Sequence, residues 1–362
     1  SETTSNSHRG DYDLCYNMDV EVEETRKVVA KFVNCEPNEV VFTSGDTMSL
    51  NMLAFGYGRK FLKAGDEILI SESEHASNVL PWFEISKMTG AVIKFIPLSD
   101  EGVILPENLA KVLSNKTKVV SIANVGNVLG FTVDIKECAR LAHEAGAIIF
   151  VDGAQSVPHM KTDFKDWDID VLTFSGHKMC GPTGIGCLIG KYSLLDTIDP
   201  LFVGGGDNVD FHTNLQAEYL NPPFKFEAGT QNLAGIIGLK AAVEFIESLG
   251  IENIHKHDQE LFDYAMSKLE AHPNVHVYNK SARGSVITFN LDGVFSQDEA
   301  TLLNHKGIAI RSGLHCAKLL PEFLKVYGTC RASTYLYTTK EEIDAFIDAL
   351  INGGDILDAY FD

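Results

Sequence analysis

The chain has 362 residues, of which 45% are hydrophobic and 22% charged, a composition typical of a folded globular protein. Its 50 acidic residues against 30 Lys and Arg give a formal net charge of −20. This balance argues against a nucleic-acid-binding protein and against binding to an anionic membrane, because both need clustered basic side chains. A single core usually stops growing below this chain length, so we expect two domains.

The cysteine pattern points to an intracellular protein without structural disulfides. Seven cysteines are spread between Cys15 and Cys330 without a C-x-x-C pair, which fits neither a disulfide framework nor a zinc ribbon. We therefore expect a reducing, cytoplasmic location. No apolar run approaches the roughly 20 residues of a membrane span. The spacing of His143, His159 and His257 is not that of metal ligands, so no metal site is predicted.

The first two thirds of the chain alternate strands with helices. Residues up to Asp13 are polar and are expected to be irregular, and helical spacing begins at Val20. Strands that are apolar on both faces and alternate with helices are typical of a mainly parallel sheet covered by helices, an α/β fold. The predicted strands are 39–43, 67–71, 91–96, 118–123, 147–152, 171–174 and 186–189, and the predicted helices are 20–33, 47–61, 78–89, 135–145 and 235–249.

A smaller unit is expected after this region. Segment 199–226 lacks clear periodicity, and a loop of that length is usually functional or faces a partner. We place a domain boundary near 245–252, which divides the chain into a large domain (1–248) and a small α+β domain (249–362). The predicted elements of the small domain are helices 253–271, 297–306 and 340–352 and strands 275–278, 285–290 and 308–311.

Asp152 and Lys178 carry the most informative chemistry. Asp152 ends one apolar strand and Lys178 follows the next apolar run, so a carboxylate and an amine are expected at one rim of the sheet. This pair suits pyridoxal 5′-phosphate (PLP), because the amine forms a Schiff base with the aldehyde and the carboxylate keeps the pyridine nitrogen protonated. A buried ion pair that joins two strands explains the two residues equally well.

Two further features favour the cofactor. Gly176, Gly181 and Gly184 surround Lys178 and leave room for a flat ring. Upstream, the loop Thr43–Thr47 joins a strand to a helix, where exposed backbone amides bind phosphate; Ser, Thr and Asp at such a place are also ordinary helix caps. The glycines that follow the lysine lack the order and setting of a dinucleotide motif, so no NAD site is predicted.

Seven segments together resemble the class V group of fold-type-I PLP enzymes, and within it the SufS-like (group II) branch of cysteine desulfurases and selenocysteine lyases. They lie in the order of that family and cover nearly the whole chain. The segments are E-H-x-x-N-x-x-P-W at 74–82, N-x-L-G at 127–130, V-D-G-A-Q at 151–155, S-G-H-K-x-x-G-P-T-G-I-G at 175–186, F-E-A-G-T at 226–230, R-x-G-x-H-C-A at 311–317 and R-A-S at 331–333.

The resemblance implies a fold, a reaction and partners. The expected fold is a large domain with a mainly parallel seven-stranded sheet and a small domain that carries a catalytic cysteine loop. The implied reaction converts L-cysteine to L-alanine, with the sulfur left as a persulfide and passed on to iron–sulfur cluster assembly. A homodimer and a sulfur-acceptor protein of the SufE or SufU type are implied as well.

The resemblance also implies a role for each matching residue. Lys178 is the expected Schiff-base lysine and carries the proton at the substrate Cα. Cys316 is the expected sulfur acceptor; by its residue type alone it would more often be a buried structural thiol. Arg311 and His315 are candidates to favour its thiolate. The remaining assignments are His75 stacked on the ring, Asp152 at the pyridine nitrogen, Gln155 and Asn127 near the phenolic oxygen, Thr47, Ser175 and His177 at the phosphate, Thr230 from the neighbouring subunit, and Arg331 with Arg311 at the substrate carboxylate.

The chain departs from the family pattern at three places. Asp46 stands where the family usually has a small hydroxyl beside the phosphate, and an anion there is unfavourable unless it turns away or caps the helix. Leu314 stands at a position that is often His. The chain begins near the H-R-G motif of the family (8–10), so the upstream segment that lines the carboxylate pocket is expected to be absent.

Two alternatives to a cysteine desulfurase remain open at this stage. One is a selenocysteine lyase or a cysteine or cystine C–S lyase on the same scaffold. The other is a catalytically impaired scaffold protein with the same fold, which the short start and Asp46 would fit.

Overall fold

The computed structural model describes residues 13–354. The expected irregular start up to residue 12 and the motif at 8–10 lie outside the described residues. Within them, no helix combines the length and the apolar composition needed to cross a membrane.

The larger part of the chain is built on a seven-stranded sheet. Its strand order is β1-β7-β6-β5-β4-β2-β3. Only β7 runs antiparallel to its neighbours β1 and β6, which confirms the prediction of a mainly parallel sheet. The strands are β1 (Val40–Thr43), β2 (Glu67–Ser71), β3 (Val92–Ile96), β4 (Thr117–Ala123), β5 (Ile148–Asp152), β6 (Val171–Ser175) and β7 (Gly186–Gly190).

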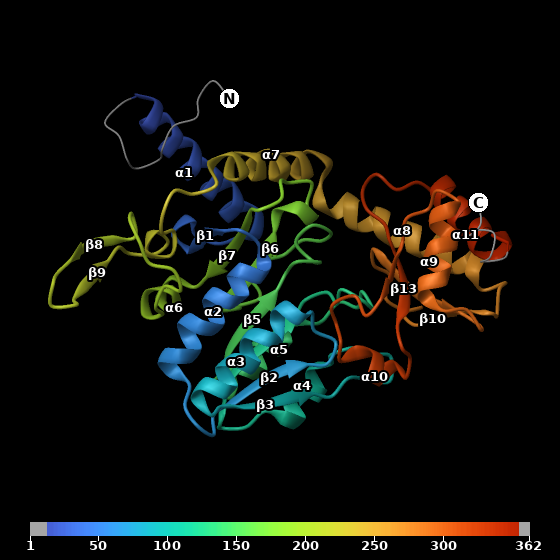
Figure 1. Cartoon of the computed structure of the whole chain (residues 1–362), viewed down its shortest axis with the longest axis horizontal. Coiled ribbons are helices and arrows are strands. Elements are labelled where there is room, and N and C mark those ends of the chain that lie inside the picture. Colours follow the sequence, from blue (N-terminus) through green and yellow to red (C-terminus); the bar gives the residue numbers. More distant parts are fainter. Residues whose placement is uncertain (1–12, 355–362) are drawn as a thin grey trace.

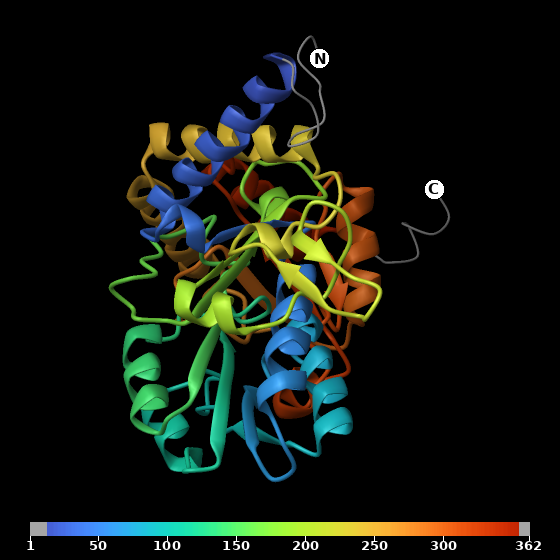
Figure 2. The same cartoon turned by 90° about the vertical axis from the view of Figure 1, so that its left-hand side faces the viewer.

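Helices cover both faces of this sheet (Figures 1 and 2). One face packs on α1 (Asp13–Val33), α4 (Pro106–Val112), α5 (Ile135–Glu144) and α7 (Leu233–Leu249) through a single apolar cluster. The other face packs on α2 (Asp46–Phe61), α3 (Leu80–Thr89) and α6 (Tyr192–Thr197) through a second cluster. The strands are buried on both sides, which is why their sequences read as continuous apolar runs.

Two local predictions were incomplete. Helix α1 starts at Asp13 instead of Val20, because buried Cys15 and Met18 extend its apolar stripe. Segment 199–226 is not a structureless loop: it holds a two-stranded hairpin of β8 (Asn208–Phe211) and β9 (Ala217–Tyr219), which projects from the body in Figure 1.

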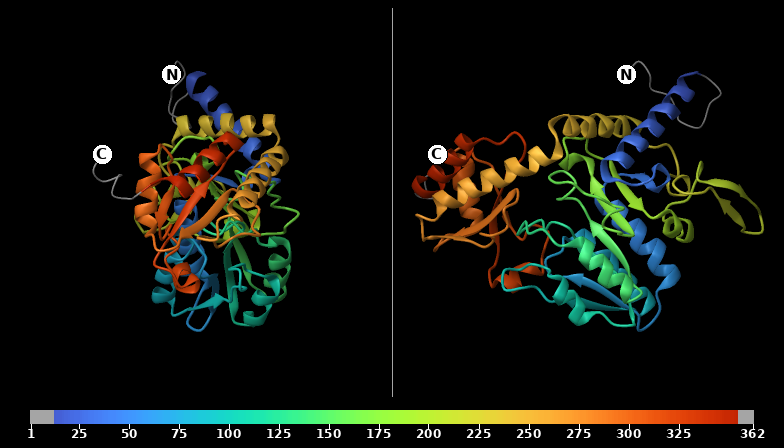
Figure 3. Two further views of the ribbon diagram at one scale, coloured as in Figure 1. Left: turned by 90° about the vertical axis from the view of Figure 1, so that its right-hand side faces the viewer. Right: turned by 180° about the vertical axis from the view of Figure 1, so that it is seen from behind.

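The C-terminal part forms a second sheet with its own apolar core. The chain turns at Gly250 between α7 and α8 (Ile251–Leu269) and continues into a sheet of order β10-β11-β13-β12, seen from behind in Figure 3. The division at 248/249 stays a prediction. The remaining elements are β10 (Val275–Val277), β11 (Val286–Leu291), α9 (Ser296–His305), β12 (Arg311–Gly313), α10 (Leu320–Leu324), β13 (Thr329–Ser333) and α11 (Lys340–Asn352).

Sequence patterns missed β13 and α10 and placed β12 too early. Only Arg311 of the predicted strand 308–311 belongs to β12. Strand β13 pairs with β11 on one side and β12 on the other, so a strand without an obvious apolar signature is central to this sheet.

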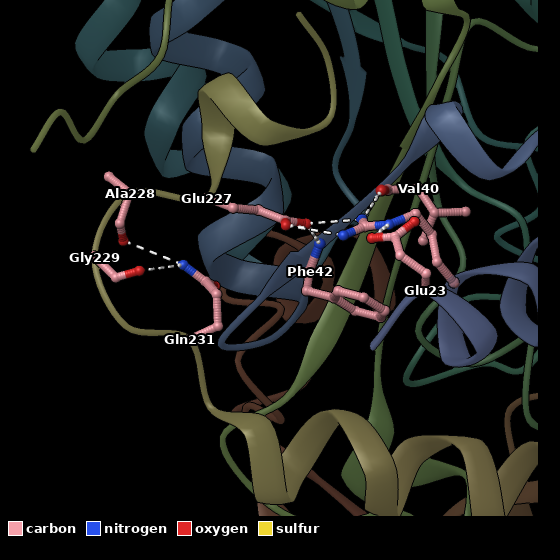
Figure 4. A network of polar contacts seen from close by, with 8 residues as sticks. Glu23, Val40, Phe42, Glu227, Ala228, Gly229 and Gln231 are labelled. Atoms are coloured by element: carbon pink, nitrogen blue, oxygen red, sulfur yellow. Dashed lines mark hydrogen bonds and ion pairs between the residues drawn. The ribbon is translucent and has the colours of Figure 1, made fainter. Parts of the chain in front are cut away.

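A buried ion pair ties the segment at 226–230 to the large sheet. Both terminal nitrogens of Arg26 on α1 donate to the carboxylate of Glu227, at 2.9 and 3.0 Å. The amide of Phe42 on β1 also donates to Glu227, at 2.8 Å, and Figure 4 shows this network. The Arg26 side chain is only 1% exposed, so the pair fixes where the loop leaves the core.

Candidate active site

A polar cavity lies at the carboxyl end of the central strands. Asp152 and Ser175 are the last residues of the neighbouring strands β5 and β6. Lys178 follows Ser175 in a short 3₁₀ turn, Gly176–Lys178. The predicted meeting of carboxylate and amine is therefore found. The cavity measures about 260 Å³ and is lined by Asp46, Thr47, His75, Ser77, Ala123, Val125, Asn127, Asp152, Ala154, Gln155, Ser175, His177, Lys178, Arg311 and Arg331.

The start of α2 forms one wall of the cavity. The amide of Asp46 donates to Ser175 Oγ at 2.8 Å, and the Thr47 hydroxyl lies 2.7 Å from the Ser77 hydroxyl. Strand β7 passes directly behind this turn, since a Cβ on Gly186 would lie 2.6 Å from the Cα of Gly45. The two glycines thus let a helix N-terminus, hydroxyls and a strand end converge, an arrangement suited to a phosphate.

His75 faces the cavity as a neutral ring. Its Nδ1 accepts from the amide of Ser77 at 3.1 Å. Partial burial lowers the pKa of His75, with Lys178 and the two arginines adding to that effect against the opposing charge of Asp152. A neutral imidazole can lie against a flat ring without adding charge to it.

A buried carboxyl group lies next to His75 and links its turn to the end of β4. Glu74 is 2% exposed; its carboxylate accepts from the Ala123 amide at 3.1 Å and from Asn78 Nδ2 at 2.8 Å. Burial, reinforced by the charge of Asp152, raises the pKa of Glu74 to about 8. Sequence reasoning quoted Glu74 within its motif but gave it no role, because only the fold shows that it lies beneath the site.

The Cys316 loop reaches the cavity from the small sheet. The Cys316 carbonyl accepts from the Ala76 amide at 2.7 Å, and the His315 carbonyl accepts from Asn127 Nδ2 at 2.8 Å. Arg311 Nη2 donates to Cys316 Sγ at 3.3 Å. His315 and Cys316 both adopt left-handed backbone angles, φ of 50° and 59°, which are uncommon for side chains of this kind and occur often at functional loops.

The prediction that His315 helps to favour the thiolate was wrong. Its Nε2 lies 2.9 Å from both the carbonyl and the hydroxyl oxygen of Thr329, and the residue is 3% exposed. Burial, followed by the charge of Arg331, lowers the pKa of His315 to about 4. The ring is neutral and is held by β13, so Arg311 is the cation that contacts the sulfur.

Arg311 and Arg331 form a like-charged pair on adjacent strands. They are direct partners in the register of β12 and β13, and like charges at such positions repel each other. Arg331 Nη1 donates to the Asn127 carbonyl at 2.6 Å. Burial and then the charge of Arg311 lower the pKa of Arg331. Two guanidinium groups held together at a cavity rim are suited to bind a carboxylate.

The cavity presents polar atoms that the described residues leave without partners. Asn127 Oδ1 and Arg331 Nε are buried and make no hydrogen bond within residues 13–354. Buried polar atoms are rarely left in this state unless a ligand or water completes them. Together with the amine, the carboxylate and the phosphate-type turn, these atoms fit a PLP cofactor and an amino-acid substrate.

Of the predicted site residues, Cys316 and Thr230 do not line the cavity. Cys316 is half-buried at its rim through the contact with Arg311. Thr230 is exposed in the loop that Glu227 anchors, and its expected contribution to a neighbouring subunit stays a prediction. Sequence reasoning did not assign Ser77 or Ala154 to the site; Ser77 links Thr47 to His75.

The fold and the cavity together define a fold-type-I enzyme of the PLP-dependent kind. The chain belongs to the aminotransferase class-V family, whose model matches residues 1–346. It is 44% identical over 347 residues to a probable cysteine desulfurase of Halalkalibacterium halodurans, covering 96% of this chain and 85% of that protein. It is also 44% identical to a probable cysteine desulfurase of Staphylococcus epidermidis, with 96% and 84% covered.

Solved structures agree with this assignment. The cysteine desulfurase CsdA of Escherichia coli superposes with a TM-score of 0.90 at 34% identity, covering 96% of this chain and 87% of that one. An apo cysteine desulfurase of Thermococcus onnurineus gives a TM-score of 0.92 at 35% identity, with 98% and 89% covered. The family and these relatives indicate a PLP-dependent enzyme.

Proposed function

We propose that this chain is a PLP-dependent cysteine desulfurase that converts L-cysteine to L-alanine and retains the sulfur as a persulfide on Cys316. The observation that carries the proposal is the contact between Arg311 and the Cys316 sulfur at the rim of a cavity that also holds Lys178 and Asp152. A nucleophilic thiol, a cation to favour its anion and a PLP-type lysine–aspartate pair are the three parts that this reaction needs.

Each cavity residue would contact a different part of the cofactor. Lys178 would hold it through its aldehyde carbon, Asp152 through the pyridine nitrogen, and His75 against the ring face. Gln155 and Asn127 would lie near the phenolic oxygen, and the unpartnered Asn127 Oδ1 supports a polar contact there. The phosphate would lie among Thr47, Ser175 and His177, with Thr230 added from a second subunit. When bound, the cofactor supplies an electron sink for negative charge at the substrate Cα.

The protein side chains would perform the sulfur transfer. Arg331 and Arg311 would bind the substrate carboxylate, and Lys178 would move the Cα proton. The Cys316 thiolate would attack the substrate sulfur, so that a sulfur–sulfur bond forms and the carbon–sulfur bond breaks. The electron pair of the broken bond stays on carbon, which takes up a proton to give alanine.

One alternative keeps the scaffold and changes the sulfur chemistry. A selenocysteine lyase or a cystine C–S lyase would use Lys178 in the same way but would release its product without a persulfide on the chain. The feature that favours this alternative is Leu314, which is exposed and lies two residues before Cys316. Relatives often carry a histidine at this position.

Mass spectrometry of the Cys316 peptide after incubation with PLP and L-cysteine tests the proposal. We expect a gain of about 32 Da, one sulfur atom, on Cys316. We also expect Cys316→Ala to lose desulfuration of L-cysteine. Persistent selenocysteine or cystine cleavage in that variant would favour the lyase. The wild-type chain should show a visible cofactor band with added PLP, and Lys178→Ala should lack that band. Absence of the band in the wild-type chain would support the impaired scaffold.

The partners follow from the same proposal. A homodimer, a SufE- or SufU-type sulfur acceptor, a role in iron–sulfur cluster assembly and a cytoplasmic location are proposed with it. The structure offers an exposed hairpin with Phe211 71% and Leu215 96% exposed, which lies in the same 199–230 region as Thr230. Sedimentation and activity after adding an acceptor protein would test these partners.

A further inference from the structure

Asp46 is an acidic residue beside the part of the cavity that is suited to bind a phosphate. It is the first residue of α2, is only 7% exposed and lines the cavity beside Thr47, Ser175 and His177. A charged carboxylate at this place would repel the phosphate that the surrounding groups are suited to bind. The chain must therefore neutralise Asp46, turn it away, or lose cofactor affinity.

Asp46 lines the cavity, and its side chain is held against strand β6. Its backbone amide donates to Ser175 Oγ at 2.8 Å, and its Oδ1 accepts from the Thr173 hydroxyl at 2.6 Å. Thr173 lies on β6 directly opposite Asp152 in the strand register. The side chain is thus fixed by one hydroxyl between the start of α2 and the Asp152 carboxylate.

The charges around Asp46 act in opposite directions. Asp152 on β5 opposes ionisation, whereas Lys178 after β6 and the N-terminal end of α2 favour it. The cavity also contains His75, His177, Arg311 and Arg331. Burial is the largest effect, and the pKa of Asp46 rises to about 8.

We propose that Asp46 is a cofactor-binding residue of this chain that is protonated whenever the dianionic phosphate is bound, so that a neutral carboxyl held by Thr173 forms part of the phosphate cradle. Where Asp46 is ionised in the free protein, it takes up a proton from solvent as the phosphate binds. This inference rests on the proposed PLP function. A protonated carboxyl has an O–H to donate to a phosphate oxygen, which restores the hydrogen-bonding property of the hydroxyl residue usual at this position.

The sign of the pH dependence follows from linkage. Below about pH 8 Asp46 is already neutral in the free protein, so binding requires no proton uptake. At higher pH the free protein must first gain a proton, so affinity falls about tenfold for each further pH unit. Between pH 7 and pH 9, the expected loss is therefore about tenfold.

Titration with pyridoxine 5′-phosphate isolates this effect, because that ligand has the phosphate but no aldehyde to react with Lys178. We expect the ratio of wild-type to Asp46→Asn dissociation constants to rise about tenfold from pH 7 to pH 9. Asn is neutral at every pH, so groups shared by both proteins cancel. Calorimetry at pH 9 in buffers of different ionisation enthalpy should show uptake of about one more proton by the wild type.

A second variant keeps the proposal testable if Asp46→Asn folds poorly. Thr173→Val removes a hydrogen bond that favours the anion, so the loss of affinity should begin at higher pH than in the wild type. A constant ratio between wild type and Asp46→Asn, or an unchanged onset in Thr173→Val, overturns the inference while PLP binding stands. If the wild-type chain binds neither PLP nor pyridoxine 5′-phosphate at pH 7, the proposed function itself is overturned.

Discussion

Removing the Glu227 carboxylate should destabilise the large sheet strongly. In Glu227→Ala, Arg26 loses its two bonds to that carboxylate and keeps the Val40 carbonyl, at 2.6 Å, and Glu23, at 3.1 Å. The Arg26 side chain is only 1% exposed beside Glu227, so little water can solvate its charge once that carboxylate is removed. Breaking a buried ion pair in this way costs about 3–5 kcal/mol, and we expect that loss in the free energy of unfolding from urea titrations.

Matched variants separate the buried charge from other causes. Glu227→Gln keeps an acceptor but no charge, so we expect about half of the loss. The double change Arg26→Met with Glu227→Leu removes both charges and should recover part of the stability. The Phe42 amide and the Val40 carbonyl lose these partners in the double variant, so the recovery should be incomplete. Glu247→Ala breaks a solvent-exposed ion pair with Lys31, in which the Lys31 side chain is 78% exposed and the Glu247 side chain 35%. This change should cost about 0–1 kcal/mol in the free energy of unfolding. If Glu227→Ala costs no more than Glu247→Ala, the reasoning is refuted.

Two further predictions concern the Cys316 loop. Arg311→Met should slow alkylation of Cys316 by iodoacetamide about tenfold at neutral pH, since a charged hydrogen bond contributes about 1.5–3 kcal/mol; exposed Cys180 in the same sample is the reference thiol. His315 is neutral in the fold, with its pKa lowered to about 4 from 6.5, so its contribution to stability is complete above pH 6.5 and is lost as the pH falls towards 4. The stability advantage of the wild type over His315→Gln should therefore shrink by about 2–3 kcal/mol between pH 7 and pH 4.

The outcomes that contradict these two predictions are equally specific. Equal alkylation ratios of Cys316 to Cys180 in wild type and Arg311→Met would show that the contact between Arg311 and the sulfur does not favour the thiolate. A stability difference between wild type and His315→Gln that stays constant from pH 7 to pH 4 would mean that His315 accepts a proton in the folded chain as readily as in the unfolded one.

The sequence predicted every strand of the large sheet but not the direction of β7. Apolar runs reveal burial on both faces, and G-C-L-I-G at 186–190 is equally apolar in either direction. A usable signal was nevertheless present. Only residues 176–185 join β6 to β7, and a parallel crossover usually needs a dozen or more residues. The connection length therefore favours an antiparallel strand.

The prediction of the site succeeded where a motif fixes both the residue type and its position. It failed where the orientation of the side chain determines the role. Ten of the predicted residues do line the cavity. His315 lies in a matching motif, but the pairing of β12 with β13 turns its ring to Thr329. The problem that Asp46 poses was visible in the sequence, whereas its partner Thr173 lies 127 residues away and no local pattern connects them.

The cavity combines parts of two sheets, and the hydrogen bonds between them place the reactive groups. Asn127 holds the His315 carbonyl and receives a bond from Arg331, while Ala76 holds the Cys316 carbonyl. These contacts use main-chain oxygens of the cysteine loop, so the sulfur remains available to its neighbour Arg311 and to substrate. Because the two arginines repel each other on adjacent strands of the small sheet, an anion bound between them would relieve that repulsion. In a chain of net charge −20, that local excess of positive charge gives the carboxylate of an amino acid a favourable place to bind.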